Sequence, residues 1–202
     1  MVSVSFVSAI TILSSSGTGD IVIPIVSNSA NVSNFNISSE LRTSSWAGLF
    51  GRFESNIILQ DASSNSLYFW KVFNFTDSVI YATNGSVSSF ESSNIVASSP
   101  SVATFPVKGS GSDSFENTFN ESGTFSSSSL SIPNTNFTRT LVNDADSSLN
   151  TYALYAQNDD VQVYASKSRG STIGFNGTSI DFQMIVPALE SGSSYNIYFE
   201  LR

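Results

Sequence analysis

The stretch Tyr195-Asn196-Ile197-Tyr198-Phe199-Glu200-Leu201, near the C-terminus, decides the fold class. Residues 195, 197, 199 and 201 are aromatic or aliphatic, and a period of two places them on one face of an extended strand. The stretch from Ile180 to Val186 alternates in the same way and stops at Pro187, and Gly192 with its serine neighbours then supplies turn chemistry. The two stretches therefore predict a closing β-hairpin.

Short stretches with strand character recur along the rest of the chain, separated by clusters of Gly, Asn, Asp and Ser. No window shows a sustained helical period with capping residues. Strands are expected near residues 2–13, 21–26, 46–53, 56–61, 67–74, 78–83, 102–107, 137–142, 152–157 and 161–166. Many short strands without helices between them predict an all-β fold, an antiparallel β-sandwich of the jelly-roll or immunoglobulin-like kind.

Chain length and two serine-rich tracts bear on the domain organisation. A chain of 202 residues suits one β-sandwich. The tracts 109–114 and 126–129 read as loops, although the first is also compatible with a linker that divides the chain near residue 108. A separate C-terminal piece would bury little apolar surface. We therefore expect a single domain at 20–202, preceded by an N-terminal strand and hinge at 1–19.

Composition excludes several classes of function. Charged residues make up 12% of the chain and the net charge is −8, so nucleic acid and anionic membranes are repelled. There is no Cys and no His, which removes thiol nucleophiles, Ser-His-Asp triads and zinc sites of the Cys/His kind. The sequence has no apolar run of about 18 residues, so no transmembrane helix is expected. We expect no catalytic residues, no cofactor and no nucleic-acid partner.

The N-terminus lacks the basic segment and long apolar core of a signal peptide, so the chain is either intracellular or numbered from a processed end.

Oxygen-rich clusters provide weak candidates for a calcium site, at Asp144 and Asp146 and at Asp159 and Asp160. Neither cluster matches an EF-hand loop, and Asn and Asp are also the usual residues of tight turns. No pair of the acidic residues lies in a glycosidase motif. Exposed aromatic rings can stack on sugars, but at strand spacing Trp46 and Trp70 fit a hydrophobic core better.

Sequons for N-linked glycosylation occur seven times, although a chain this rich in Asn, Ser and Thr carries several by chance. Two of them, at Asn84 and Asn176, precede Gly in expected turns, where a transferase has access. The full set of glycosylation candidates is Asn31, Asn36, Asn74, Asn84, Asn120, Asn136 and Asn176.

The N-terminal segment reads as a β-strand followed by a hinge at 14–19 that is rich in Ser and Gly. Such a strand either pairs within its own sheet or adds to the sheet of the next subunit as a donor strand. Donated side chains would fill pockets in that neighbour. The apolar residues expected to do so are Val2, Val4, Phe6, Ile10 and Ile12.

A further block combines rare residues in a fixed order: Trp46, Gly48, Gly51, Asp61, Leu67, Trp70, Tyr81 and Ala82. This Trp-x-Gly-x-x-Gly, Leu-x-x-Trp and Val-Tyr-Ala-like pattern resembles a family of archaeal secreted surface proteins, as do the closing stretches 181–187 and 195–201. The resemblance implies an exported, glycosylated protein on the cell surface. It is also compatible with archaeal filaments, such as pili or threads, whose subunits exchange N-terminal donor strands.

The sequence thus favours an extracellular structural subunit that forms a head-to-tail homopolymer by donor-strand complementation, with an adhesive or bundling role. Two alternatives stay open: a monomeric carbohydrate-binding or adhesin module, and a jelly-roll viral capsid protein.

Overall fold

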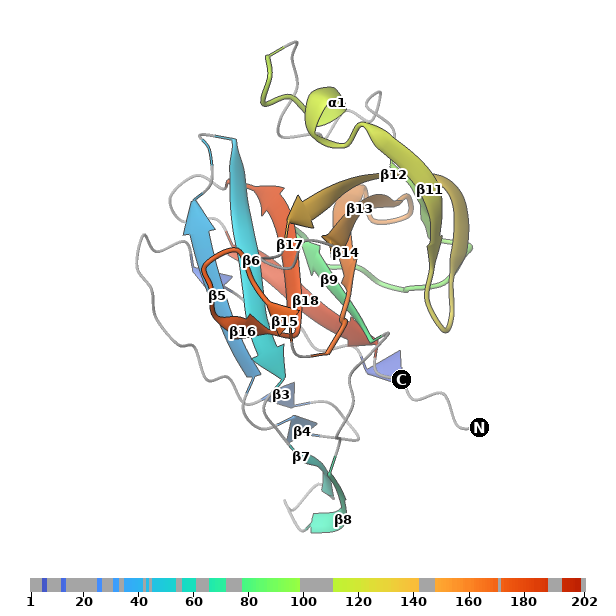
Figure 1. Ribbon diagram of the computed structural model, residues 1–202. Helices are drawn as coiled ribbons and strands as arrows, with labels where there is room; N and C mark the ends of the chain where they lie inside the picture. Colours follow the sequence, from blue (N-terminus) through green and yellow to red (C-terminus); the bar gives the residue numbers. More distant parts are fainter. Residues whose placement is uncertain are drawn as a thin grey trace.

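The computed structural model describes residues 43, 45–52, 78–98, 111–139, 149–170, 172–188 and 195–200 with their side chains. It describes the backbone alone at 5–6, 12–13, 25–26, 31–32, 35–41, 53, 56–60, 66–71, 140–141, 148 and 194. Antiparallel strands dominate these residues (Figure 1), and their single helix is one turn, α1 (Phe115–Thr118). The predicted all-β, antiparallel fold class is therefore confirmed.

A large sheet forms the centre of the molecule. Its strands follow the order β1-β18-β9-β14-β13-β12-β11, and β2 and β10 pair with β18 and β13 outside this path. In that order the strands are β1 (Ser5–Phe6), β18 (Ser194–Glu200), β9 (Val79–Thr83), β14 (Val161–Lys167), β13 (Ser148–Ala156), β12 (Ser131–Leu141) and β11 (Glu121–Ser126), with β2 (Ile12–Leu13) and β10 (Ile95–Ala97) beside them.

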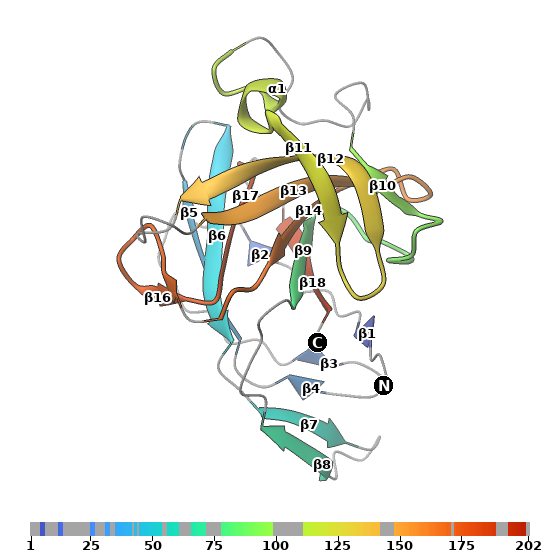
Figure 2. The ribbon, with the colours of Figure 1, turned by 45° about the vertical axis from the view of Figure 1, so that its right-hand side comes forward.

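A smaller sheet of β17 (Phe182–Pro187), β6 (Trp46–Phe53) and β5 (Phe35–Leu41) packs through β17 against β13 and β14. A short hairpin of β15 (Thr172–Ile173) and β16 (Ser179–Ile180) contacts β6. The remaining sheet lies at one end of the molecule (Figures 1 and 2) and comprises β3 (Ile25–Val26), β4 (Asn31–Val32), β7 (Asn56–Gln60) and β8 (Ser66–Lys71).

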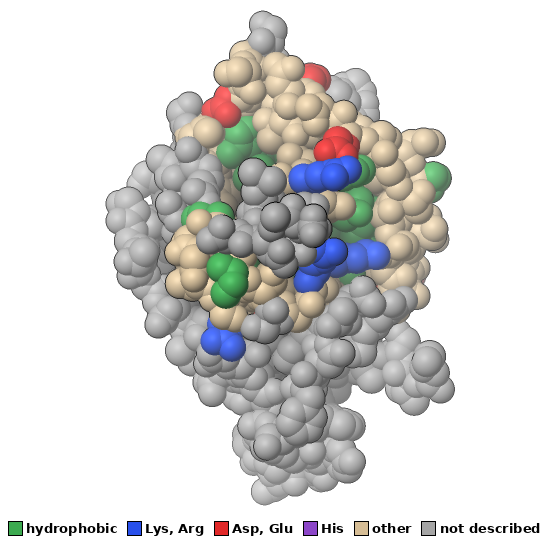
Figure 3. Space-filling view, viewed as in Figure 1, with side chains coloured by type: hydrophobic (Ala, Val, Ile, Leu, Met, Phe, Trp, Pro, Cys, Tyr) green, Lys and Arg blue, Asp and Glu red, His purple; other side chains and the backbone are tan. Residues whose placement is uncertain are grey.

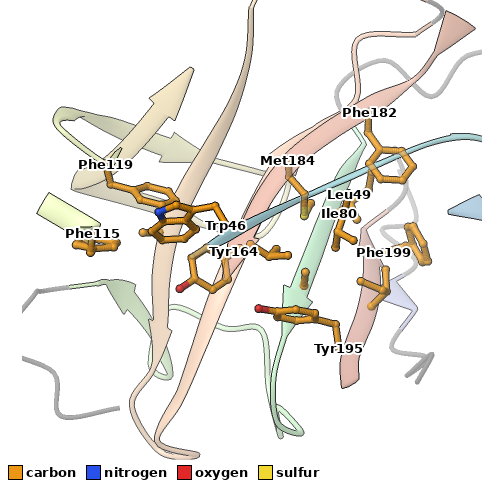
Figure 4. Close-up of a cluster of buried hydrophobic side chains, with 14 residues drawn as sticks. Trp46, Leu49, Ile80, Phe115, Phe119, Tyr164, Phe182, Met184, Tyr195 and Phe199 are labelled. Atoms are coloured by element: carbon orange, nitrogen blue, oxygen red, sulfur yellow. The ribbon is translucent and has the colours of Figure 1, made fainter. Parts of the chain in front are cut away.

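The large sheet is buried on both faces, because alternate residues of its central strands enter two different cores. In β9, Ile80 and Ala82 face the first core, whereas Val79 and Tyr81 face the second. The first core lies between the two sheets (Figure 4) and consists of Trp46, Leu49, Ile80, Ala82, Phe115, Phe119, Ala153, Tyr164, Phe182, Met184, Val186, Tyr195, Ile197 and Phe199. The second includes Tyr81, Phe125, Leu154, Val163 and Tyr198.

Hydroxyl side chains attach the backbone of β17 to the large sheet. The Ile185 N–H donates to Thr151 Oγ1 at 3.0 Å, and Ser166 Oγ donates to the Gln183 carbonyl at 3.1 Å. Ser168 Oγ donates to the carbonyl of Asp181, the residue before β17, at 3.1 Å. All three hydroxyl residues are buried. They hydrogen-bond backbone groups along β17 that would otherwise lose their solvent partners on burial.

The predicted closing hairpin is wrong. Although β17 and β18 are consecutive strands, β17 pairs with β6 in the small sheet and β18 pairs with β9 in the large one. Each alternating stretch finds its apolar partner face far away in the sequence, so long-range packing outweighs the local turn signal. Residues 121–126 form β11, which pairs with β12 around the turn at 127–130, and the expected strand near 137–142 begins earlier, at Ser131. The expected strand at 102–107 lies outside the described residues.

None of the described residues belongs to a helix long and apolar enough to cross a membrane.

Candidate assembly site

Two short strands of the N-terminal segment, β1 and β2, pair with β18 of the same chain. Strand β1 pairs antiparallel with one end of β18, Ser5 opposite Glu200 and Phe6 opposite Phe199. Strand β2 pairs with the other end, Leu13 opposite Ser194 and Ile12 opposite Tyr195. The opposite edge of β18 is taken by β9. The segment therefore occupies an edge that would otherwise expose backbone N–H and C=O groups.

The register preserves the alternation predicted for the donor strand. Residues 7–11 separate Phe6 from Ile12, whereas only residues 196–198 separate their partners, so the segment carries two extra residues between the pairs. Because this excess is even, Phe6 and Ile12 both lie opposite residues of the first core, Phe199 and Tyr195. The predicted donor residues Val2, Val4 and Ile10 lie outside the described residues, as does the hinge at 14–19.

Glu200, at the end of β18, carries a carboxylate that the sequence analysis did not single out. Glu200 is buried, with 6% of its surface exposed. Tyr81 of β9 donates its hydroxyl to Glu200 Oε2 at 2.7 Å. From the turn between β11 and β12, Ser128 donates its hydroxyl to Oε1 and Ser129 donates its N–H to the same oxygen at 3.0 Å. The Glu200 carboxylate thus links β18, with which β1 and β2 pair, to the β11–β12 hairpin.

Two opposing effects determine how Glu200 ionises. Burial, the larger single effect, raises its pKa, but the hydrogen bonds from Ser128, Tyr81, Ser127 and the Ser129 N–H together outweigh burial and hold the pKa below its ordinary value. Burial and then the Glu200 charge raise the pKa of Tyr81. The pair therefore consists of an ionised acceptor and a neutral donor, the arrangement of a charge-assisted hydrogen bond.

Lys167, at the end of β14, binds the same hairpin from the other side. Val79 of β9 lies opposite both Glu200 and Lys167, so the two charged residues flank it on one face of the sheet. Lys167 Nζ donates to Ser126 Oγ at 3.1 Å. Glu200 and Lys167 therefore hold the tip of the β11–β12 hairpin over the second core, and we call these two residues the hairpin clamp.

The sequons differ in accessibility. Asn84, Asn120 and Asn176 are exposed. Asn136 is half-buried in β12, opposite Ser122 of β11. Asn31 and Asn36 lie in strands described by their backbone alone, and Asn74 lies outside the described residues. Asn176 occupies the turn between β15 and β16, where its Oδ1 accepts from the Thr178 N–H at 3.0 Å and the Thr178 hydroxyl at 2.7 Å.

The calcium candidates at 159 and 160 have turn roles. Asp159 Oδ2 accepts from the Ser88 N–H at 3.1 Å and from Asn94 Nδ2 at 2.8 Å, and these bonds lower its pKa. Asp160 accepts the Tyr155 hydroxyl. Asp144 and Asp146 lie outside the described residues. Within the described ranges, no group of three or more acidic side chains is placed to hold a metal ion.

Trp46 is a core residue, as predicted. It is 2% exposed, packs against Phe119 and Tyr164, and donates its indole Nε1–H to the Asp113 carbonyl at 2.9 Å. The side chain of Trp70, in β8, is not among those described. Among the coloured atoms on the face drawn in Figure 3, charged side chains are few.

Comparisons with known proteins add no relative: no family model, no curated protein and no solved structure matches the chain.

Proposed function

We propose that the chain is an extracellular structural subunit that assembles head to tail by strand donation. The single observation that carries the proposal is that the edge of β18 accepts β1 and β2, which here pair with it within the same chain. The same antiparallel pairing between two chains would place the N-terminal segment of one subunit on β18 of the next. Because the donating and accepting surfaces differ, each subunit keeps one of each, and the assembly grows as a fibre.

Surface chemistry supports the same proposal. Charged residues make up 12% of the chain, and salt would screen the repulsion between fibres that arises from the net charge of −8, which suits bundling or adhesion. Exposed sequons at Asn84, Asn120 and Asn176 would carry glycans on an exported protein. The resemblance of the Trp46 to Ala82 block to archaeal secreted surface proteins points to the same compartment. We assign the chain no catalytic role, in keeping with its lack of His and Cys.

A cysteine pair tests whether the strand pairs within one chain or between chains. The native chain has no Cys, so Leu13→Cys and Ser194→Cys introduce the sole thiols. These residues lie opposite each other in the ladder, where paired Cα atoms stand about 4.5–5.5 Å apart, within the range of a disulfide. Oxidation of the assembled double variant should give a ladder of covalent multimers on a non-reducing gel.

Mixing two single variants isolates the contact between chains. Leu13→Cys protein co-assembled with Ser194→Cys protein should form a disulfide-linked heterodimer. Leu13→Cys mixed with Ser86→Cys, whose thiol lies on an exposed loop, should not. If the double variant instead closes into an internally crosslinked monomer and electron microscopy shows no filaments, strand donation is wrong and the segment serves its own sheet.

A further inference from the structure

We propose that a cavity between the small sheet, α1 and β12 binds a single pyranose residue of a saccharide. The cavity has a volume of ≈ 420 Å³, within the range of about 300–1,000 Å³ typical of small-molecule sites. Its walls are Thr43, Trp46, Gly48, Asp113, Thr118, Arg139, Phe175, Gln183, Met184 and Ile185. This site is separate from the edge of β18 and does not depend on strand donation.

The walls combine apolar and polar groups as sugar recognition requires. Phe175 and Ile185, both half-buried, provide apolar surface for the C–H groups of a pyranose ring, and the buried side chains of Trp46 and Met184 lie behind them. Phe175 is half-buried and packs edge-on against Phe50, which holds its ring in place. Trp46 is held by its hydrogen bond to Asp113 and lies beside Phe119 and Tyr164 (Figure 4).

The cavity wall also contains donors and acceptors that can form further hydrogen bonds. Within the described part of the chain, the Asp113 carboxylate and the Thr118 hydroxyl make no hydrogen bond, although Asp113 is half-buried. Arg139 uses Nε and Nη2 to bind Glu121 Oε2, at 3.0 and 2.9 Å, which leaves other N–H groups of its guanidinium available. A carboxylate acceptor and a guanidinium donor in the wall of one cavity suit sugar hydroxyls, each of which both donates and accepts.

The balance of charge favours a neutral ligand. Among the described residues of the wall, Asp113 and Arg139 are the charged ones, so neither an anion nor a cation would find an excess of opposite charge there. A saccharide satisfies both groups without bringing a charge of its own. The saccharide has two possible sources: another molecule, or a glycan linked to Asn176, the residue that follows Phe175 of the cavity wall.

The indole N–H resonance of Trp46 reports on the cavity directly, and Trp70→Phe identifies it because the chain has two Trp residues. The full-length, unglycosylated chain is titrated by NMR with the methyl glycosides of glucose, mannose and galactose and with N-acetylglucosamine. At least one should shift the resonance, with a Kd in the millimolar range. Asp113→Asn keeps the carbonyl that holds Trp46 and should raise this Kd at least about fivefold, the loss of one hydrogen bond.

Glu116→Gln, an exposed substitution on α1 outside the cavity wall, is the matched control and should bind as the unmodified chain does. In glycosylated protein, a displaced Trp46 resonance that returns to its unglycosylated position in Asn176→Gln identifies the linked glycan as the occupant. The proposal is overturned if no sugar and no linked glycan shifts the resonance, or if Asp113→Asn binds as tightly as the unmodified chain. Neither result would bear on filament formation.

Discussion

Replacing Glu200 with Gln should weaken the fold at neutral pH by removing a charge while keeping the shape of the side chain. The carboxylate accepts from Tyr81, Ser128 and the Ser129 N–H. Gln has one acceptor oxygen, and its amide NH₂ would meet donors in place of an acceptor. A hydrogen bond to a charged group contributes about 1.5–3 kcal/mol, whereas one between neutral groups contributes about 1 kcal/mol. The neutral Gln side chain also costs less to bury than the charged carboxylate, which offsets part of the lost stability.

We therefore expect Glu200→Gln to lower the free energy of unfolding by about 2 kcal/mol at pH 7. In a chain of this length that corresponds to a melting temperature lower by about 4–8 °C. The pKa of Glu200 is lowered on folding from its ordinary value of 4.5. Its stabilising effect is thus complete above that value and is lost as the pH falls through the lower, folded pKa. The free energies of unfolding of the variant and of the unmodified chain should therefore become equal in acid.

Urea denaturation followed by intrinsic fluorescence, at pH 7 and at successively lower pH, measures both effects. Glu121→Gln serves as the control, because that carboxylate forms an ion pair with Arg139 in which the side chains are 37% and 59% exposed. An exposed pair contributes about 0–1 kcal/mol. If Glu200→Gln loses no more stability than Glu121→Gln at pH 7, or if its deficit persists unchanged in acid, the assigned role of the carboxylate is wrong.

Other buried polar groups give further predictions, each measured by thermal and urea denaturation. Tyr164→Phe removes a buried hydroxyl that has no hydrogen-bond partner among the described residues, so stability should stay the same or rise. Tyr195→Phe removes a 2.7 Å bond to the Pro187 carbonyl and should cost about 1 kcal/mol. A destabilised Tyr164→Phe would show that this hydroxyl has a partner. Thr151→Val keeps the side-chain shape but leaves the Ile185 N–H without its acceptor, and we expect a loss of about 1–3 kcal/mol. A neutral effect would mean that this bond does not stabilise β17.

The sequence predicted those strands whose alternation is strong, and for a physical reason. β9 and β14 lie close to their expected positions, and all their residues except Lys167 are buried because both faces of these strands are covered. β5 and β11 were not predicted. In β5 (Phe35–Leu41) Ser39 interrupts the apolar alternation, and in β11 (Glu121–Ser126) Phe125 is the one large apolar side chain. Each strand takes its place in a sheet by forming a hairpin with the next strand along the chain, β6 or β12.

The residues of the candidate sites likewise include some that the sequence predicted and some that it did not. The strands β1 and β2 lie within the expected strand at 2–13, because alternation is a local pattern, whereas the hinge and the donor role stay predictions. The hairpin clamp could not be predicted, because Glu200 lies in a strand where alternation marked one face as apolar and left the other unassigned. A signal was present in Tyr198, two residues earlier on the same face, which is 3% exposed. The cavity brings together residues from 43 to 185, and no sequence spacing predicts such a set.

The backbone pairing of Ser5 with Glu200 links the hairpin clamp to the proposed assembly site, because the clamp holds the end of β18 on which β1 lies. Loss of the carboxylate should therefore loosen that end and leave the other end, where β2 pairs with residues 194 and 195, unaffected. Hydrogen exchange followed by mass spectrometry separates the two ends. Glu200→Gln should speed exchange at 5–6 and 198–200 while 12–13 and 194–196 keep their protection. Equal loss at both ends would mean that β18 opens as one unit and that the clamp supports the whole edge.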